Sequence, residues 1–457
     1  MKLLKHITIL SLSITLNLTT GHSETESSSG KTLLGEWWQG KGAAGSLFGV
    51  RDELADWGFT LVGGWRGQFF GVVDGGIGGV RGGFFDEEIK FSAELDFAKL
   101  WKAEALSGWK AFGEVRWRDG LNPNLRAGAF RVFQPSDYQG GKQWRLSNFG
   151  SSYTTPELFG VKEFLSVTGG WLQPQKFFVQ QPLSKLFVNN AVNSSKGLGG
   201  NIPFSSSFSS WGGVVTIKPR EWHYARAGFF MAYPEATSTR NHGLAFAGNA
   251  QNPSQTGLFV MAETGFTPKL GPSSLPGKYV FGGYSYGQWN TSYRGARYPN
   301  LYGFYWQADQ MLWREPTAEV AVRDDKSGKM ILAPAGKISD QGLHIISLLA
   351  YAPKYNNIMP FYFHTGLIYK GLLPTRDNDQ TMCSFALGQY SVYNIRNLQA
   401  EGTANQPNST AVLEFGHRVQ LNSWAYIQPF LQYIIKPNGT NTIENTTILG
   451  MTAGVNF

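Results

Sequence analysis

Several short stretches of this chain of 457 residues place charged and polar side chains at every second position. In one of them, Glu114, Arg116 and Arg118 alternate with Val115 and Trp117. The other polar positions that share one parity within their stretch are Arg66 and Gln68; Lys90, Ser92, Glu94 and Asp96; Tyr224 and Arg226; and Glu414, Arg418 and Gln420. Arginine presents five fixed hydrogen-bond donors, and a carboxylate accepts from hydroxyl groups. A face that combines the two could therefore bind a ligand rich in hydroxyl groups.

A spacing of two residues is that of a β-strand, in which successive side chains point to opposite faces of the sheet. If the strands close into a barrel within a membrane, a charge facing lipid at the midplane costs about 2–4 kcal/mol, so the charged parity should face inward. The interior would then mix arginines with carboxylates. The alternative is that these interior charges pair with one another and only line a solvated wall.

The end of the chain gives the clearest sign of such a barrel. From residue 447 to 457 one parity is mainly apolar and ends in Phe457, whereas the other holds Gly450, Thr452, Gly454 and Asn456. Strict alternation up to a terminal aromatic residue is typical of the last strand of an outer-membrane β-barrel. An ordinary amphipathic strand is the alternative.

The beginning of the chain predicts export. Lys2 and Lys5 precede an apolar run over residues 7–18, and small residues at 21 and 23 offer a cleavage site for a signal peptidase. We therefore expect residues 1–23 to be a signal peptide and the mature chain to begin at Glu24. The formal net charge of +8 falls by two when Lys2 and Lys5 are removed, and so small an excess on an exported chain argues against nucleic acid as a partner.

The remaining chain is expected to form an N-terminal periplasmic or pore-entering segment (24–56) and one outer-membrane β-barrel (57–457). Residues 46–57 should form a short helix or turn before the first strand. Aromatic residues make up 14% of the chain and glycines number 56, yet the mean hydropathy is negative. Apolar surface without an apolar run of about 20 residues fits membrane strands better than membrane helices.

About sixteen segments have strand character, which predicts an all-β fold, a transmembrane antiparallel β-barrel. They are Phe59–Phe69, Ile89–Phe97, Lys110–Arg118, Gly128–Phe133, Glu163–Trp171, Gly213–Pro219, His223–Met231, Gly257–Phe266, Lys278–Gly287, Leu301–Trp313, Gly342–Ala352, Pro360–Tyr369, Met382–Val392, Ala411–Asn422, Trp424–Ile435 and Thr446–Phe457. The low-complexity stretches Asn189–Ser210 and Gly248–Thr256 are expected to be loops.

Three stretches resemble the carbohydrate-selective porin (OprB) family of Gram-negative outer membranes. Residues 309–314 (Asp-Gln-Met-Leu-Trp-Arg) resemble the family's Asp-Gln-x-Leu-x-Arg strand end. Residues 366–379 resemble its Gly-Leu…Gly-Leu-x-Pro-Gly-Arg-x-x-Asp turn, and residues 428–434 its Gln-Pro-Asp-Leu-Gln-Tyr block. Thr375 replaces the usual glycine and Phe430 the usual aspartate, so the chain would be a divergent member. The resemblance implies a sixteen-stranded barrel in the bacterial outer membrane and passive diffusion of mono- or oligosaccharides.

The resemblance also implies a constriction of arginines with nearby carboxylates and aromatic rings. The residues of this chain expected to line the pathway are Arg66, Glu114, Arg116, Arg118, Asp309, Arg376 and Glu414. Arg376 and Asp379 could instead stabilise the turn that contains them. Trp171 or Trp211 could supply an aromatic ring, or could belong to a girdle at the membrane interface.

Other functions have less support. The histidines show no metal spacing, and no catalytic constellation or cofactor motif can be assembled, so we expect neither an enzyme nor a cofactor. A general or anion-preferring porin without sugar selectivity is the main alternative, and a barrel enzyme is a weaker one. The expected partners are saccharides and outer-membrane lipids, and the sequence leaves open a homo-oligomer.

Overall fold

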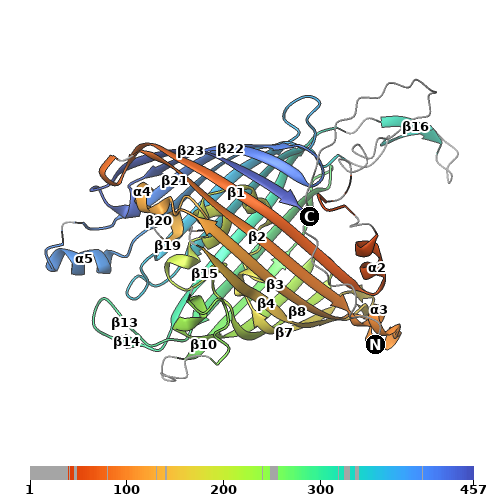
Figure 1. The fold of residues 1–457 in the computed structure, drawn as a ribbon, viewed down its shortest axis with the longest axis horizontal. Coiled ribbons are helices and arrows are strands. Elements are labelled where there is room, and N and C mark those ends of the chain that lie inside the picture. The colour runs from red at the N-terminus through yellow and green to blue at the C-terminus, as the bar shows by residue number, and fades with distance from the viewer. Residues whose placement is uncertain are drawn as a thin grey trace, which may run out of the picture. The chain divides into compact units, whose positions relative to one another are not determined.

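The chain is dominated by long antiparallel strands (Figure 1). A computed structural model describes residues 40, 42–45, 49–79, 81–129, 131–138, 142–238, 240–247, 256–316, 319–323, 330–334, 339–403 and 405–457. Within these ranges, seventeen strands form one sheet. All but the two-residue β11 (Lys269–Leu270) are strands of a closed barrel, and we call these sixteen barrel strands staves. Each stave pairs with the next along the chain, and the last pairs with the first. No helix in the described part of the chain is long and apolar enough to cross a bilayer.

The sixteen staves are β1 (Phe59–Gly76), β2 (Gly82–Asp96), β3 (Trp109–Gly120), β4 (Gln143–Thr154), β7 (Leu165–Leu172), β8 (Ser210–Arg220), β9 (His223–Ala232), β10 (Gly257–Phe266), β12 (Leu275–Tyr286), β15 (Leu301–Arg314), β18 (Gly342–Tyr351), β19 (Phe361–Lys370), β20 (Gln380–Gln389), β21 (Ser409–Gln420), β22 (Ala425–Ile435) and β23 (Glu444–Asn456). We call the end where β1 begins and β23 ends the terminal end, and the opposite end the loop end.

Closure leaves no unpaired edge, which is what a sheet within hydrocarbon requires. In β23 the alternation has the expected meaning: Leu449 and Met451 are exposed on the outer face, whereas Thr452 points inward and is fully buried. The same outward parity gives every part of the barrel an apolar exterior. Exposed examples are Phe69, Phe91, Val115, Val215, Phe229, Val260, Phe281, Phe304, Leu349, Leu367, Phe415 and Leu431.

The expected number of strands is confirmed, but one predicted strand was wrong and another was missed. Gly128–Phe133 is not a strand; Arg131–Phe133 forms a short 3-10 turn whose apolar neighbours are buried inside the barrel. The missed stave is β4, in which Ser147 has no partner in the register with β3. This β-bulge switches the outward parity from Trp144 and Leu146 to Phe149, so no single alternation runs through the strand.

The shorter elements lie between the staves. They are the helices α2 (Val50–Asp56), α3 (Phe97–Trp101), α4 (Asn124–Ala127) and α5 (Val392–Ala400), and the two-stranded pairs β5 (Glu157–Leu158) with β6 (Val161–Lys162), β13 (Asn290–Thr291) with β14 (Arg297–Tyr298), and β16 (Glu319–Arg323) with β17 (Met330–Pro334). Of the helix or turn expected over residues 46–57, the described part forms the helix α2. The expected signal peptide, most of the N-terminal segment and nearly all of the loop Gly248–Thr256 lie outside the described residues.

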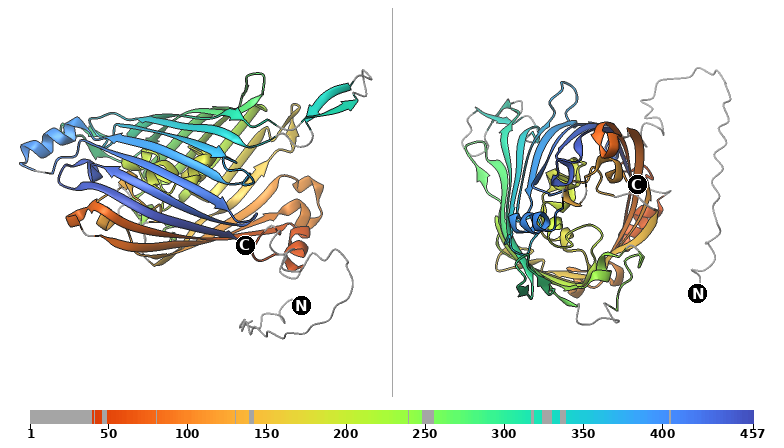
Figure 2. Two further views of the ribbon diagram at one scale, coloured as in Figure 1. Left: turned by 90° about the horizontal axis from the view of Figure 1, so that it is seen from above. Right: turned by 90° about the vertical axis from the view of Figure 1, so that its left-hand side faces the viewer.

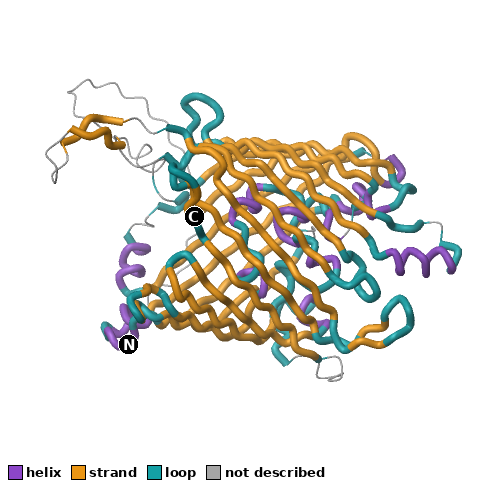
Figure 3. Tube along the Cα trace, turned by 180° about the vertical axis from the view of Figure 1, so that it is seen from behind, coloured by secondary structure: helices purple, strands orange, loops and turns teal. Residues whose placement is uncertain are grey.

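The connection between β7 and β8 folds into the barrel (Figures 2 and 3). We call it the inserted loop (residues 173–209). It consists of short turns: η4 (Pro174–Lys176), η5 (Pro182–Leu186), the π-helical η6 (Ala191–Ser195) and η7 (Leu198–Gly200). It contains nearly all of the low-complexity stretch that was expected to be a loop.

Apolar side chains of the inserted loop form the core of the molecule together with inward side chains from β9 to β22. Phe187 and Val192 of the loop are fully buried. The inward-facing staves contribute Phe230, Phe259, Ile346, Leu348, Tyr362, Val412 and Ile434, each at most 2% exposed. We call this inward surface of β9 to β22, covered by the inserted loop, the filled wall. One side of the lumen is therefore packed like a protein interior, and open space remains beside β1 to β3.

Candidate functional site

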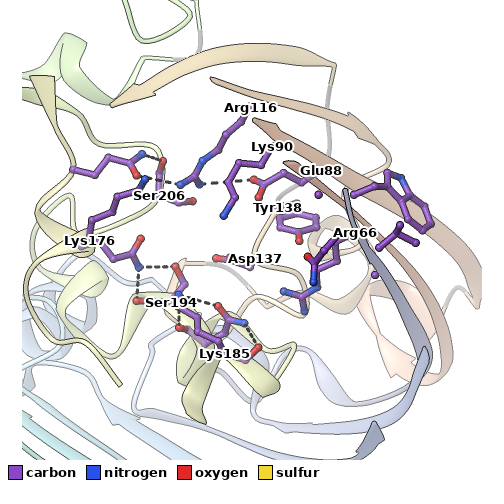
Figure 4. Close-up of a pocket in the computed structure, with 18 of the residues that line it drawn as sticks. Arg66, Glu88, Lys90, Arg116, Asp137, Tyr138, Lys176, Lys185, Ser194 and Ser206 are labelled. Atoms are coloured by element: carbon purple, nitrogen blue, oxygen red, sulfur yellow. Dashed lines mark hydrogen bonds and ion pairs between the residues drawn. The ribbon is translucent and has the colours of Figure 1, made fainter. Parts of the chain in front are cut away.

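A cavity of about 470 Å³ lies in that remaining space (Figure 4). Its lining comes from β1 to β3, from β22 and β23, from residues 137–138 and from the inserted loop. The charged residues and tyrosines of the lining are Arg66, Glu88, Lys90, Arg116, Asp137, Tyr138, Lys176, Lys185 and Tyr426. Polar side chains between them are Gln173, Gln175, Gln180, Asn193, Ser194, Ser206 and Asn456. The cavity is thus lined by hydrogen-bonding groups of both signs and by two phenol rings.

The register of β1, β2 and β3 brings the charged wall together. Arg66 pairs with Glu88 across the first two strands, and Lys90 pairs with Arg116 across the next two. Because all four share the inward parity, their side chains face the cavity. We call these four residues the open wall. Figure 4 shows them around one space, facing Tyr138 and the inserted loop.

Ion pairs hold Arg116 of this wall and the neighbouring Arg118 in place. Arg116 contacts Glu114 at 2.8 Å and Glu88 at 3.8 Å, and Arg118 contacts Glu88 at 2.7 Å. Lys176 of the inserted loop approaches Glu114 from the other side at 2.5 Å. Glu114 and Arg118 are therefore paired, in agreement with the first part of the alternative, and they are buried behind the surface of the cavity. Arg116 is paired and lines the cavity as well.

Tyr138 is held against this wall by charge and by its own loop. The guanidinium carbons of Arg66 and Arg118 lie 5.5 and 5.2 Å from the centre of its ring. Its backbone N–H donates to the hydroxyl of Ser136, which in turn donates to Asp86 on β2. Burial raises the pKa of the Tyr138 phenol well above its ordinary value, so the group stays neutral. The ring therefore offers an apolar face and a neutral hydroxyl beside two cations.

Two carboxylates anchor the inserted loop through its backbone. Glu414 on β21 accepts from the N–H groups of Val188 and Asn189 at 2.6 and 2.7 Å. Glu263 on β10 accepts from the N–H of Val179 at 3.1 Å. Both carboxylates are at most 5% exposed. Charge-assisted hydrogen bonds of this kind are roughly twice as strong as neutral ones, so they set the depth of the loop in the barrel.

Polar side chains add to these anchors. Within the loop, the buried ammonium of Lys196 donates to the carbonyl of Val179 at 2.8 Å and so braces the segment that Glu263 holds. Gln181 donates to Asp309 at 2.5 Å and contacts the ring of His364 at 2.9 Å. The loop is therefore tied to β10, β15, β19 and β21, on the side of the barrel opposite the open wall.

The structure divides the seven expected pathway residues into three groups. Arg66 and Arg116 line the cavity, and Glu114 and Arg118 stand directly behind it. Asp309 and Glu414 contact the inserted loop on the far side of the lumen.

Arg376 is the seventh, and it lies in the turn between β19 and β20 at the terminal end. It makes two hydrogen bonds of 2.8 Å to Asp379, which agrees with the alternative that these two residues stabilise their turn.

Trp171 and Trp211 both lie on the outer face. Trp171 pairs with Trp211 across β7 and β8, and Phe246 covers both rings. Neither tryptophan lines the cavity, whereas Tyr138 and Tyr426 do.

Sequence reasoning missed the part of the lining that comes from loops. Asp137, Tyr138, Lys176 and Lys185 belong to segments without periodicity, so no pattern marks them as inward-facing. Lys90 had the required parity but was not carried into the expected site. No group of three His, Cys, Asp or Glu side chains that could hold a metal ion occurs among the described residues.

A closed barrel of sixteen strands, narrowed by a loop folded into its lumen, is the architecture of a porin. The chain matches the family model described as "Carbohydrate-selective porin, OprB family" over residues 86–457. It is 24% identical over 462 residues to Porin B of Pseudomonas aeruginosa, covering 94% of this chain and 92% of that protein.

Two solved structures of Pseudomonas putida OprB share the fold. The high-pH structure has a TM-score of 0.78 at 20% identity and the low-pH structure 0.57 at 17%, each covering 92% of this chain and 99% of the other. The chain belongs to the carbohydrate-selective porin (OprB) family and is an outer-membrane porin, which confirms the resemblance found in its sequence. The family and the fold are those of a channel.

Proposed function

We propose that mono- and oligosaccharides cross this porin through the cavity beside the open wall, and that the residues of the cavity give the preference for sugars. The observation that carries the proposal is the lining itself, in which cations, carboxylates, amides and two tyrosines surround one space. A neutral sugar presents hydroxyl donors and acceptors around a ring with apolar C–H faces. Arg66 and Arg116 would donate to the hydroxyl groups, Glu88 and Asp137 would accept from them, and the ring of Tyr138 would lie against a C–H face.

Passage also requires that binding stay weak. Arg116 is held by carboxylates, so a sugar must share its donors rather than take all of them. Each charge-assisted hydrogen bond to the sugar would be worth roughly 1.5–3 kcal/mol at most, and less in a wet lumen. Several weak contacts along a wall allow a solute both to enter and to leave.

The test is the block of ion current by sugars in planar bilayers. Arg66→Ala and Arg116→Ala should weaken the block while the barrel stays folded, because interior substitutions tune selectivity more than stability. Arg220→Ala is the matched control, since Arg220 is exposed at the terminal end of β8, outside the cavity. An unchanged block in both cavity variants would refute the proposed pathway.

An anion-preferring porin remains the second candidate, and one observation favours it. Five cations but only two carboxylates line the cavity, counted as Arg66, Lys90, Arg116, Lys176 and Lys185 against Glu88 and Asp137. The same variants separate the two functions. A sugar pathway predicts a loss of saccharide block larger than the loss of anion preference, whereas an anion porin predicts a shift of reversal potential alone.

We further propose that residues 1–23 are removed on export and that residues 24–56 precede the barrel on its periplasmic side or at the pore. The basic residues Lys2 and Lys5 before the apolar run 7–18 support the first point. Intact-mass measurement of protein purified from outer membranes should give a chain that begins at Glu24. A mass that includes residue 1 would exclude cleavage.

A further inference from the structure

Three cationic side chains from three different connections converge on one tyrosine at the loop end. Around the ring centre of Tyr393 lie the guanidinium carbon of Arg294 at 4.7 Å, the ammonium of Lys354 at 5.5 Å and the guanidinium carbon of Arg396 at 5.9 Å. We call these four residues the Tyr393 cluster. Tyr393 stands in the first turn of α5, whose start is capped by the hydroxyl of Ser391. Figure 1 shows α5 and the β13–β14 pair at the same end of the barrel.

The cations of this cluster have no acidic partner within the described residues: no carboxylate oxygen lies within 4.0 Å of Arg294, Lys354 or Arg396. The cavity differs, because Arg116 and Lys176 there are both paired with Glu114. Three like charges around one ring repel one another, and only part of that repulsion is offset by contact with the ring. A bound anion would relieve the repulsion.

A hollow of about 400 Å³ at the same end of the barrel is lined in part by residues next to the cluster in the sequence. Its lining residues are Tyr293, Ile358, Tyr390, Asn394, Leu398, Asn405, Pro407, Asn438 and Thr440. Tyr293 precedes Arg294 and Asn394 follows Tyr393, so the hollow and the cluster share the same two segments. Asn397 of α5 ties these segments together by donating to the carbonyl of Tyr293 at 2.7 Å. The hollow falls in the range of roughly 300–1,000 Å³ that is usual for ligand pockets.

We propose that the loop end carries a binding site for an anionic saccharide, with the sugar ring in this hollow and its carboxylate or phosphate group on the Tyr393 cluster. Tyrosine rings and amide groups suit the ring and hydroxyl groups of a sugar, and guanidinium groups suit carboxylate and phosphate oxygens. The site is separate from the cavity beside the open wall, and the proposal does not depend on which solutes cross the pore. The longer connections of outer-membrane barrels face the outside, which places the loop end there. Two sources then share this chemistry: the phosphorylated sugar headgroup of an outer-leaflet glycolipid, and a free acidic oligosaccharide.

The first experiment compares acidic and neutral sugars in solution. Purified protein in neutral detergent is titrated calorimetrically with trigalacturonate and with maltotriose, at low and high salt. We expect trigalacturonate alone to bind at this site, more weakly at high salt, and the triple variant Arg294→Gln/Lys354→Gln/Arg396→Gln to lose roughly tenfold or more in affinity. Arg240→Gln, an exposed arginine at the same end of the barrel, is the matched control and should bind like the wild type.

The second experiment identifies the source. Native mass spectrometry of protein extracted from outer membranes shows whether a glycolipid stays bound, and heat-modifiable mobility on gels shows that each variant is folded. A glycolipid adduct on the wild type that is lost from the triple variant assigns the site to the membrane. Binding of trigalacturonate without an adduct assigns it to a free saccharide. If the triple variant equals the wild type in both measurements, or if neither ligand binds the wild type, the proposal is overturned.

Discussion

The open wall and the filled wall of this barrel are built from strands of the same kind but face different surroundings. On the open wall, Arg66 and Lys90 line a cavity together with other polar groups. On the filled wall, Leu348 and Val412 occupy the same inward parity and are completely buried under the inserted loop. The difference comes from the loop, whose apolar side chains pack against the filled wall while polar side chains such as Lys176 face the open side. A porin can therefore set the width and chemistry of its path by where one connection is anchored, without changing its strands.

The largest effect is expected from releasing that anchor. Glu414→Ala removes the acceptor of two buried N–H groups, and each unsatisfied group costs about 1–3 kcal/mol, so the inserted loop should move and the single-channel conductance should rise. Glu414→Gln keeps one carbonyl oxygen and should give an intermediate conductance.

The control for this comparison is Glu401→Gln, an exposed acid beside the C-terminal end of α5. It should leave conductance unchanged. A conductance in Glu414→Ala equal to that of the wild type, with the barrel still heat-modifiable, would show that the filled wall does not depend on this anchor.

A smaller effect is expected from a carboxylate on the open side. Glu114 accepts from Arg116 and Lys176, so Glu114→Gln leaves both cations less neutralised and should shift the reversal potential toward anions. The lost contacts are worth about 1.5–3 kcal/mol each as hydrogen bonds to charged groups, and the loss should also loosen Lys176. Glu444→Gln, exposed at the loop end of β23, serves as control. An unchanged reversal potential in Glu114→Gln would mean that permeating ions do not sense this wall.

The smallest effect is expected in the turn between β19 and β20, which belongs to neither wall. Burial alone would raise the pKa of Asp379, but the hydrogen bonds from Arg376 and from the N–H of Gln420 hold it below its ordinary value. A lowered pKa means that the contribution to stability is present above the ordinary value and is lost as pH falls below about 4. Asp379→Asn should therefore lower the melting temperature slightly at pH 7, and by less at pH 3.

Conductance and sugar block should not change in Asp379→Asn, because this turn lies away from the cavity. If the variant melts like the wild type at pH 7, the ion pair of Arg376 with Asp379 is a surface contact that does not stabilise the turn. If it alters sugar block, Arg376 acts on the pathway after all.

The fold was readable from the sequence because lipid imposes one rule on every strand: the outward parity must be apolar. That rule marks Leu449 and Phe415 without any knowledge of the interior. It fails at Ser147, where a bulge switches the parity of β4, and at Gly128–Phe133, where an apolar stretch is buried as a loop inside the barrel.

The inward parity obeys no such rule, which limits what could be predicted about the site. Arg66 and Arg116 were found because they are charged residues on the open wall. Glu414 is also charged and faces inward, but it holds the inserted loop. Only the position of that loop distinguishes a residue that lines the cavity from one that anchors the loop. The low-complexity sequence of the loop predicts irregular structure, but nothing in it names the strands against which it packs.

Solutes should pass along the open wall and be excluded from the filled wall, and the accessibility of introduced thiols reports this division. The exposed Cys383 on the outer face of β20 is first replaced by serine, and Lys90→Cys and Val412→Cys are made separately in that background. A charged methanethiosulfonate reagent is then added during bilayer recording. We expect rapid modification and a stepwise fall in current for Lys90→Cys. Val412→Cys should not react, because Val412 is fully buried. Modification of Val412→Cys as fast as that of Lys90→Cys would contradict this division.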